Sequence, residues 1–210
     1  MEHNYRKWFG EKRAKQALTA FADKGWRTFY TEDVQTAKTL LFETCLPQGV
    51  SVGLGGSETL AALAVLPLLR SDKYRLYDRY DCPDHFAMCR DSLMADYFLT
   101  SANALTLTGE MVNIDCSGSR VAAMAYGPRH IVVVAGVNKL CDTLEEAVAR
   151  VHTIAPMNCK RNNHQTPCVT GACTDCNMPA RMCNHLLITF NAQKFQGKYT
   201  LILINEELGF

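Results

Sequence analysis

Short apolar segments alternate with amphipathic segments along most of this 210-residue chain, and that alternation is the strongest constraint on its fold. Residues 131–135 (IVVVA) are continuously apolar, as is typical of a strand buried on both faces. Strands that alternate with helices imply a right-handed, mainly parallel sheet that helices cover on both sides. The sequence therefore predicts the α/β class, with a mainly parallel sheet flanked by helices.

The periodicity of apolar residues and the turn signals between them define the expected elements. Helices are expected over residues 3–24, 32–45, 58–66, 83–94, 119–125 and 144–154, with Thr31 and Ser57 as N-caps of the second and third. Strands are expected over residues 27–30, 50–54, 74–77, 96–100, 104–108, 111–115, 131–135, 186–190 and 199–204. Gly109-Glu110 predicts a hairpin turn between two of these strands.

Composition excludes several classes of protein. With 48% hydrophobic residues and a formal net charge of +1, the chain is neither a disordered protein nor a binder of nucleic acid through bulk charge. The longest apolar run, residues 60–69, is about half of the roughly 20 residues that a membrane span needs, and Pro67 interrupts it. Residues 1–7 lack the apolar core of a signal peptide. We therefore expect a cytoplasmic protein without a membrane span, whose thiols are kept reduced.

Polar residues follow several of the expected strands. In open parallel sheets, ligands bind beyond the carboxyl ends of the strands. Four polar clusters occupy such positions: residues 53–57, 100–103, 136–139 and 205–207. Their convergence predicts a pocket for a small molecule.

The glycine-rich loop that includes Gly55, Gly56 and Ser57 is a candidate anion site. Glycines permit a close backbone approach, and the start of a helix offers unpaired N–H groups to a phosphate or carboxylate. The loop is neither a Walker A motif nor G-x-G-x-x-G, so a nucleotide-specific interpretation fails. The alternative is a tight turn in which Ser57 only caps the following helix.

The middle of the chain supplies further candidates for this pocket. Lys and Arg side chains suit an anionic substrate, and carboxylates suit proton transfer. The candidate substrate-binding residues are Asn103, Asn113, Arg120 and Asn138, and the candidate catalytic residues are Asp115, Lys139 and Glu206. Structural roles are the alternative for each residue: the asparagines as turn residues, and Arg120 with Asp115 as an ion pair.

Five of the ten cysteines crowd into residues 159–183. Cys168, Cys173, Cys176 and Cys183 follow the spacing C-x4-C-x2-C-x6-C, whose first part is also found in plant-type ferredoxins. Four reduced thiolates so close in sequence suit an iron–sulfur cluster, with zinc as the alternative. We favour a 4Fe–4S over a 2Fe–2S cluster. Cys159 is a fifth candidate ligand, and whether it binds stays open.

Several of these segments together resemble the LUD-domain family of lactate-utilisation proteins. The resemblance rests on residues 53–60, 100–104, 112–115, 120–122, 126–128, 136–139 and 205–210. It implies a fold similar to that of ribose-5-phosphate isomerase and glucosamine-6-phosphate deaminase, formed by residues 1–156 and 184–210. Residues 157–183 resemble the cysteine-rich insert of one branch of the family, and this segment is the expected metal-binding part.

Three functions follow from these observations. The first is a redox protein that binds an iron–sulfur cluster and a small carboxylate such as lactate, and contributes to lactate oxidation or electron transfer. The second is a zinc-stapled, non-redox enzyme of isomerase or ligase type that acts on a phosphorylated small molecule. The third is a binding protein whose cysteine segment is a docking surface. Redox partner subunits and a homo-oligomer are compatible with the first.

Overall fold

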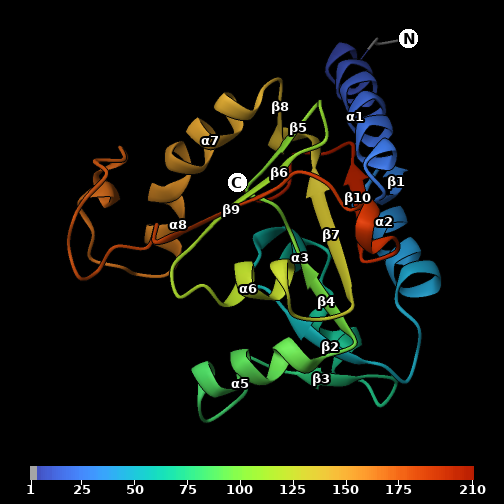
Figure 1. The fold of residues 1–210 in the computed structure, drawn as a ribbon, viewed down its shortest axis with the longest axis horizontal. Coiled ribbons are helices and arrows are strands. Elements are labelled where there is room, and N and C mark those ends of the chain that lie inside the picture. Colours follow the sequence, from blue (N-terminus) through green and yellow to red (C-terminus); the bar gives the residue numbers. More distant parts are fainter. Residues whose placement is uncertain (1–3) are drawn as a thin grey trace.

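Six parallel strands form the central sheet of the computed structural model, which describes residues 4–210 (Figure 1). Their order across the sheet is β1 (Arg27–Thr31), β10 (Tyr199–Ile204), β7 (His130–Gly136), β4 (Tyr97–Thr100), β2 (Ser51–Leu54) and β3 (Arg75–Tyr77). The last strand of the chain, β10, lies between β1 and β7 and is parallel to both. The α/β class with a parallel sheet flanked by helices is confirmed.

Helices cover both faces of this sheet and divide the core in two. Along β7, Ile131 and Val133 face one apolar cluster, and Val132 and Val134 face the other. Helices α1 and α6 contribute to the first cluster, and α2, α3 and α4 to the second. All residues of 131–135 are buried, as the continuous apolar run predicts. The bounds are α1 (Tyr5–Asp23), α2 (Val34–Leu40), α3 (Glu58–Ala62), α4 (Leu66–Leu69), α5 (His85–Asp91), α6 (Ser119–Ala125), α7 (Leu144–Thr153) and α8 (Ala155–Arg161).

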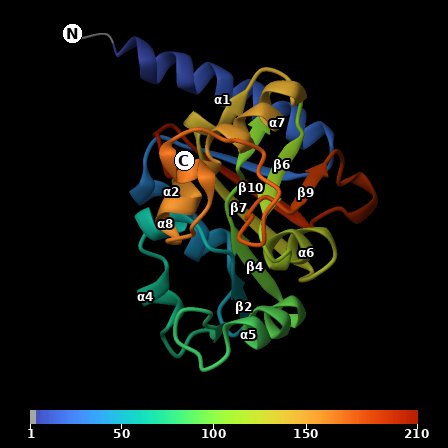
Figure 2. The ribbon, with the colours of Figure 1, turned by 90° about the vertical axis from the view of Figure 1, so that its left-hand side faces the viewer.

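A second, four-stranded sheet corrects the expectation of a single sheet. Its order is β8 (Leu140–Cys141), β5 (Ala104–Thr106), β6 (Met111–Asp115) and β9 (His185–Thr189). Strands β5 and β6 are antiparallel and form the hairpin expected at Gly109. Strand β9 pairs antiparallel with β6, while β8 is parallel to β5. Helix α7 packs on this sheet through Ala147 and Val151 (Figure 2).

Two expected helices differ from the structure at identifiable residues. Helix α2 is capped by Asp33 and not by Thr31, because the Asp33 carboxylate accepts a 2.7 Å hydrogen bond from the N–H of Thr36. A π-helical turn (Leu41–Cys45) continues α2. The expected helix over residues 58–66 ends at Ala62, and Ala64 has a positive φ of 48°. Pro67 has no N–H to continue the helix, and it lies in the first turn of the separate α4.

The cysteine-rich segment follows α8 and leads into β9. It contains one short 3-10 turn (Pro167–Thr170) and otherwise irregular chain. It forms the orange loops beside α7 and α8 in Figure 1. Four further short turns complete the described structure: Ser92–Met94, Val137–Lys139, Gln193–Phe195 and the π-helical turn after α2. None of the helices in residues 4–210 combines the length and apolar character that crossing a bilayer requires. Residue 3 of the first expected helix lies outside the described residues.

Candidate functional site

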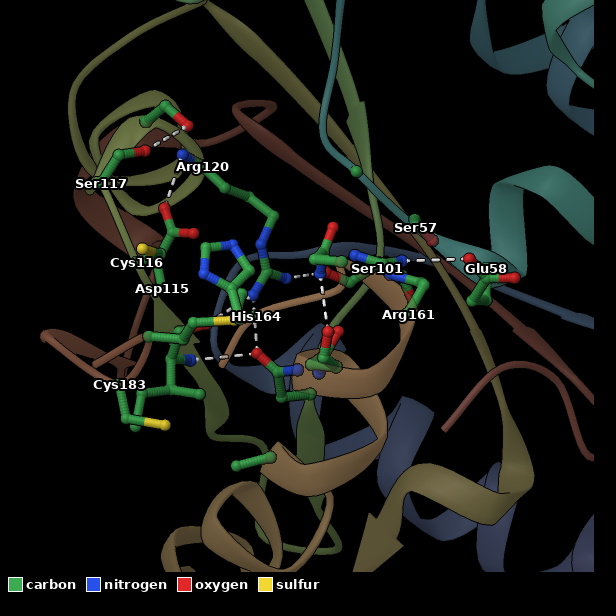
Figure 3. A pocket seen from close by; sticks show the side chains of 18 of the residues that line it. Ser57, Glu58, Ser101, Asp115, Cys116, Ser117, Arg120, Arg161, His164 and Cys183 are labelled. Carbon is green, nitrogen blue, oxygen red and sulfur yellow. Dashed lines mark hydrogen bonds and ion pairs between the residues drawn. The ribbon is translucent and has the colours of Figure 1, made fainter. Parts of the chain in front are cut away.

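A pocket of about 360 Å³ lies at the carboxyl ends of the central strands. It is lined by residues that follow β2 (Gly56, Ser57, Glu58), β4 (Ser101, Ala102, Asn103), β6 (Cys116, Ser117, Ser119) and β10 (Phe210), together with Asp115, Arg120 and Lys139. Arg79, His85, Phe86, Asn158, Arg161, Asn162, His164, Met182 and Cys183 also contribute. Figure 3 shows Asp115, Cys116 and Cys183 on one side and Ser57, Glu58 and Arg161 on the other. We call this cavity the anion pocket, for the charges described next.

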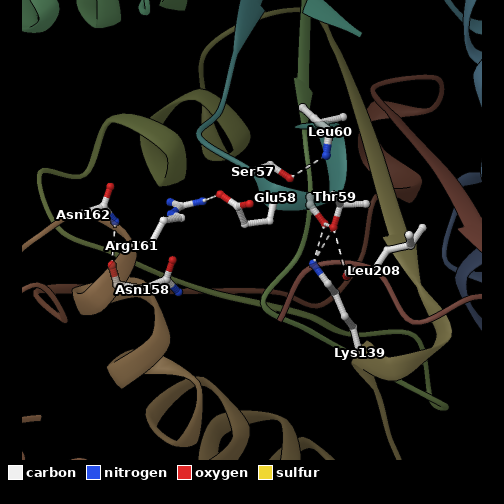
Figure 4. A network of polar contacts seen from close by, with 10 residues as sticks. Ser57, Glu58, Thr59, Leu60, Lys139, Asn158, Arg161, Asn162 and Leu208 are labelled. Atoms are coloured by element: carbon white, nitrogen blue, oxygen red, sulfur yellow. Dashed lines mark hydrogen bonds and ion pairs between the residues drawn. The ribbon is translucent and has the colours of Figure 1, made fainter. Parts of the chain in front are cut away.

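Lys139 is a buried cation in the wall of the anion pocket. Its Nζ donates hydrogen bonds to Ser101 Oγ at 2.9 Å and to Thr59 Oγ1 at 3.0 Å, as Figure 4 shows for Thr59. The side chain is 3% exposed. Burial and the nearby positive charge of Arg120 lower the pKa of Lys139 to about 7. Lys139 can therefore either neutralise an anion or exchange a proton near neutral pH.

Arg120 is held by a set of oxygen acceptors. Its Nη2 donates to Asn103 Oδ1 at 2.6 Å and to the Ile114 carbonyl at 2.8 Å. Its Nη1 donates to Asn113 Oδ1 at 3.0 Å and to the Ser101 carbonyl at 3.1 Å. Burial lowers the pKa of Arg120. These contacts fix the guanidinium in the pocket wall.

Asp115 contacts the backbone of Arg120 and not its guanidinium. The Asp115 carboxylate accepts a 2.8 Å hydrogen bond from the backbone N–H of Arg120, at the start of α6. No side-chain ion pair joins these two residues among those of the described chain. The guanidinium therefore has no carboxylate in direct contact, although the nearby charge of Asp115 favours its protonated form.

Two further arginines add positive charge. Arg161 forms a 3.2 Å ion pair with Glu58. Arg79 donates to the Leu54 carbonyl at 3.4 Å, and its buried Nε has no partner within residues 4–210. With Arg120 and Lys139, these side chains place four cationic groups around one cavity, which has two carboxylates, those of Glu58 and Asp115. An anionic ligand is therefore the chemistry that this pocket favours.

The structure brings six of the sequence-predicted residues to this pocket and leaves four outside its lining. Gly56, Ser57, Asn103, Asp115, Arg120 and Lys139 line it. Gly55 lines a neighbouring cavity instead. Asn113 lies outside the lining, and its Oδ1 accepts a hydrogen bond from Arg120 Nη1. Asn138 accepts a hydrogen bond from the N–H of Leu208, and Glu206 accepts one from the N–H of Val137 through its backbone carbonyl. These two hydrogen bonds attach the C-terminal segment to residues 137–138.

Sequence reasoning missed several lining residues. Arg79 lies in irregular chain between β3 and α5 and carries no motif. Phe210 reaches the pocket because β10 ends at the same edge of the sheet as β2 and β4. The strand order that brings Phe210 there is not visible in the sequence. Glu58 follows the glycine loop, and its proximity to Ser57 was the available signal.

The cysteine-rich segment gathers its thiols around a second, small cavity. Cys159, Cys168, Cys173, Cys176 and Cys183 line a space of about 10 Å³, together with His152 and Asp175 among others. Cys168 Sγ lies 3.2 Å from Cys159 Sγ, and both side chains are buried. Burial and the neighbouring thiol of Cys159 raise the pKa of Cys183 to about 11. We call these five residues the cysteine cluster.

The cysteine cluster fits a thiophilic metal in the kind of donor that it offers. Thiolates are the ligands of iron–sulfur clusters and of structural zinc. Within residues 4–210, no three His, Cys, Asp or Glu side chains lie at metal-ligand geometry. The thiols therefore surround one space without the spacing of a closed coordination sphere.

The anion pocket and the cysteine cluster share part of one wall. Ala155, Met182 and Cys183 line both cavities. Arg181 fixes the chain at this place, because its guanidinium donates to the carbonyls of Cys176 at 2.6 Å and Cys183 at 2.9 Å. A structural change in the cysteine cluster would therefore take place next to any ligand bound in the anion pocket.

The fold and site define an α/β protein with a cationic pocket at the carboxyl edge of a parallel sheet. The LUD domain model matches residues 14–204, so the chain belongs to the LUD-domain family, which is related to lactate utilisation. It is similar to the crystal structure of a DUF162 family protein from Deinococcus radiodurans, with a TM-score of 0.55 and 12% identity, over 93% of this chain and 97% of that one. At that identity the likeness shows the fold alone. No curated protein matches the chain.

Proposed function

We propose that this chain is a redox protein of lactate utilisation. In this proposal the anion pocket binds a small carboxylate such as lactate, and the cysteine cluster holds an iron–sulfur cluster that accepts or passes electrons. The observation that carries the proposal is the shared wall, because Met182 and Cys183 lie against both cavities. Oxidation of lactate to pyruvate releases two electrons and two protons, so a cluster at this place would take the electrons one at a time and pass them to a redox partner subunit.

The charge of the anion pocket supports a carboxylate ligand. Arg79, Arg120 and Arg161 surround the cavity, and the buried Nε of Arg79 is a donor without a partner within the described residues. Guanidinium groups bind carboxylates through charge-assisted hydrogen bonds. Lys139 Nζ, with a pKa of about 7, can take up a proton from the bound ligand or return it.

Cys168, Cys173, Cys176 and Cys183 are the residues that would hold the cluster, with Cys159 as a fifth thiol beside Cys168. The group would supply one-electron chemistry, which no side chain of the pocket offers. The raised pKa of Cys183 means that its thiol is protonated at neutral pH in the free protein. Ligation therefore releases protons and is favoured by higher pH.

Anaerobic purification followed by iron, sulfide and zinc analysis tests the cysteine cluster. We expect iron and acid-labile sulfide bound to the chain and visible absorption that dithionite bleaches. Cys173→Ala should lose most of both signals. Cys45→Ala is the matched control, because Cys45 is a buried free cysteine in the π-helical turn after α2, outside the cysteine cluster, and should leave both unchanged. A colourless protein with stoichiometric zinc would contradict the iron–sulfur proposal.

Calorimetric titration with lactate tests the anion pocket. Lys139→Met should weaken lactate binding at least tenfold at pH 6.5, because a desolvated charge is lost from the wall of the cavity. Lys38→Met on α2, outside the lining of the pocket, is the control and should bind lactate as the unmodified chain does. Equal affinities for both variants would contradict a carboxylate site at this position.

One observation favours the second candidate, a zinc-stapled isomerase or ligase that acts on a phosphorylated small molecule. Lys139 has a pKa near neutrality and shares the pocket with Asp115, a combination that suits proton transfer without redox chemistry. Sugar phosphates and lactate are compared by thermal shift at equal concentration, since the stabilisation of the folded state increases with the logarithm of ligand concentration over Kd. A larger shift with a sugar phosphate, together with bound zinc, would favour this candidate.

A further inference from the structure

A second cavity of about 700 Å³ adjoins the anion pocket. It lies along α3 and the turn into α4, and its lining is largely apolar, with Leu60, Ala61, Val65 and Pro67 among the contributors. We call this space the apolar chamber. Ala61 and Pro67 are exposed to solvent there, although their side chains carry no polar group. A concave apolar surface of this size beside a charged pocket is typical of a ligand site.

The apolar chamber and the anion pocket share one boundary. Ser57, Glu58, Arg79 and Arg161 line both cavities. Arg161 and Glu58 form their ion pair there, and Figure 4 shows it beside Ser57. Their side chains are 28% and 45% exposed, so solvent screens the pair and a ligand can displace it. A single molecule can therefore extend from the charged cavity into the apolar one.

The dimensions of the site also argue for a ligand larger than lactate. The anion pocket alone has about 360 Å³, a volume typical of drug-sized ligands. Lactate carries one carboxylate, one hydroxyl and a methyl group. It occupies part of the anion pocket and leaves the apolar chamber without a contact.

We propose that the preferred ligand is a 2-hydroxy acid with an extended apolar side chain. Its carboxylate lies among the cationic groups of the anion pocket, and its apolar side chain passes the Arg161–Glu58 pair into the apolar chamber. This inference rests on the proposed function, since it assumes that the anion pocket takes a carboxylate. It adds that the length of the ligand's apolar side chain, and not only the ligand's charge, determines affinity.

The test is a calorimetric series of straight-chain 2-hydroxy acids, from lactate through 2-hydroxybutyrate to 2-hydroxyhexanoate, on the full chain. Each added methylene that reaches the chamber should tighten binding about three- to fourfold. Ala61→Trp should place an indole ring in the path of the ligand's apolar chain and lower the affinity for 2-hydroxyhexanoate at least tenfold, while lactate binds unchanged. Ala62→Trp is the matched control, because Ala62 is the exposed next residue of α3 and is not part of the chamber lining.

The outcomes separate this inference from the function on which it rests. If lactate binds and affinity does not rise with chain length, the chamber proposal is wrong and the carboxylate site stands. If no acid of the series binds, both are wrong. Equal affinities of the Ala61→Trp and Ala62→Trp variants for 2-hydroxyhexanoate would also overturn it. The proposal would also be wrong if Ala61→Trp alone changed the mass of the oligomer in analytical ultracentrifugation. A second copy of the chain, and not a ligand, would then cover the chamber in the unmodified protein.

Discussion

At the scale of single residues, burial determines what the pocket can do. Lys139 lies in the wall of the cavity with two hydroxyl partners, and its charge is opposed by burial and by Arg120. A lysine in that position binds an anion strongly only while it is protonated. The same residue thus provides both a charge for recognition and a proton for chemistry.

Anion affinity should depend on pH through Lys139. Because the pKa is about 7, carboxylate affinity should fall as pH rises from 6 to 8, by up to about tenfold per pH unit above 7. Lys139→Met should bind more weakly and with a flatter pH profile. Calorimetry across this range measures both, and an equal slope in the variant would show that another group titrates.

The pH dependence of the unfolding free energy is an independent measure of the shifted pKa of Lys139. The folded-state pKa of about 7 lies below the ordinary value of 10.5, so between these pH values the unfolded chain holds a proton that the folded chain lacks. Stability contributed by Lys139 therefore rises with pH across this window, by at most about 1.4 kcal/mol per pH unit. Urea denaturation of Lys139→Met should lack that rise.

Arg120 should be the most costly pocket residue to truncate. Its guanidinium donates to four oxygen acceptors, and without it the carbonyl of Ser101 and the amide oxygen of Asn103 each lose a charge-assisted hydrogen bond and keep only a neutral donor, the Thr100 hydroxyl and the Ile114 N–H. We expect Arg120→Met to destabilise the fold by about 3 kcal/mol in urea denaturation. Arg90→Met, at an exposed position on α5, is the control and should stay within about 0.5 kcal/mol of the unmodified chain.

At the scale of elements, local patterns predict strands and tight turns better than they predict helix ends. The buried run 131–135 and the hairpin at Gly109 follow from side-chain type and turn chemistry alone. The break at Ala64 and the cap at Asp33 depend on a backbone angle and on one hydrogen bond. Asp is a better N-cap than Thr by intrinsic preference, and Thr31 is instead the last residue of β1.

The C-terminal segment after β10 gives an element-scale prediction. Asn138 accepts a hydrogen bond from Leu208 N and donates one to the Gly209 carbonyl, which ties this segment to the end of β7. Asn138→Ala should cost about 1 kcal/mol in urea denaturation. Asn138→Asp keeps the acceptor for Leu208 N and should recover part of this loss.

The same pair of variants separates the observed position of Asn138 from the anion-binding role that the sequence predicts. A new carboxylate within an anion site would repel the ligand, and affinity would fall by more than tenfold. Because Asn138 lies outside the lining of the anion pocket, we expect lactate affinity of Asn138→Asp to change less than threefold. Calorimetric titration at pH 7 measures the difference.

At the scale of the whole molecule, topology assembles the site from distant parts of the chain. Strand β10 lies between β1 and β7, and this order brings Phe210 to the same pocket that Gly56 lines. The polar strand ends were visible in the sequence because parallel strands share one carboxyl edge. The second sheet was not visible, because the pairing of β9 with β6 joins segments about 70 residues apart and has no local signal.

That assembly also places the cysteine cluster against the anion pocket, and the two should be energetically coupled. Because Met182 and Cys183 line both cavities, ligation of the thiols fixes part of the pocket wall. Lactate affinity should then differ at least fivefold between metal-loaded protein and protein treated with a chelator. By reciprocity, saturating lactate should change the metal affinity, measured by chelator competition at equilibrium, by the same factor. Met182→Ala keeps all five thiols and should reduce both the change in lactate affinity and the change in metal affinity. Equal lactate affinities in the metal-loaded and the chelator-treated protein would mean that the two cavities are not coupled.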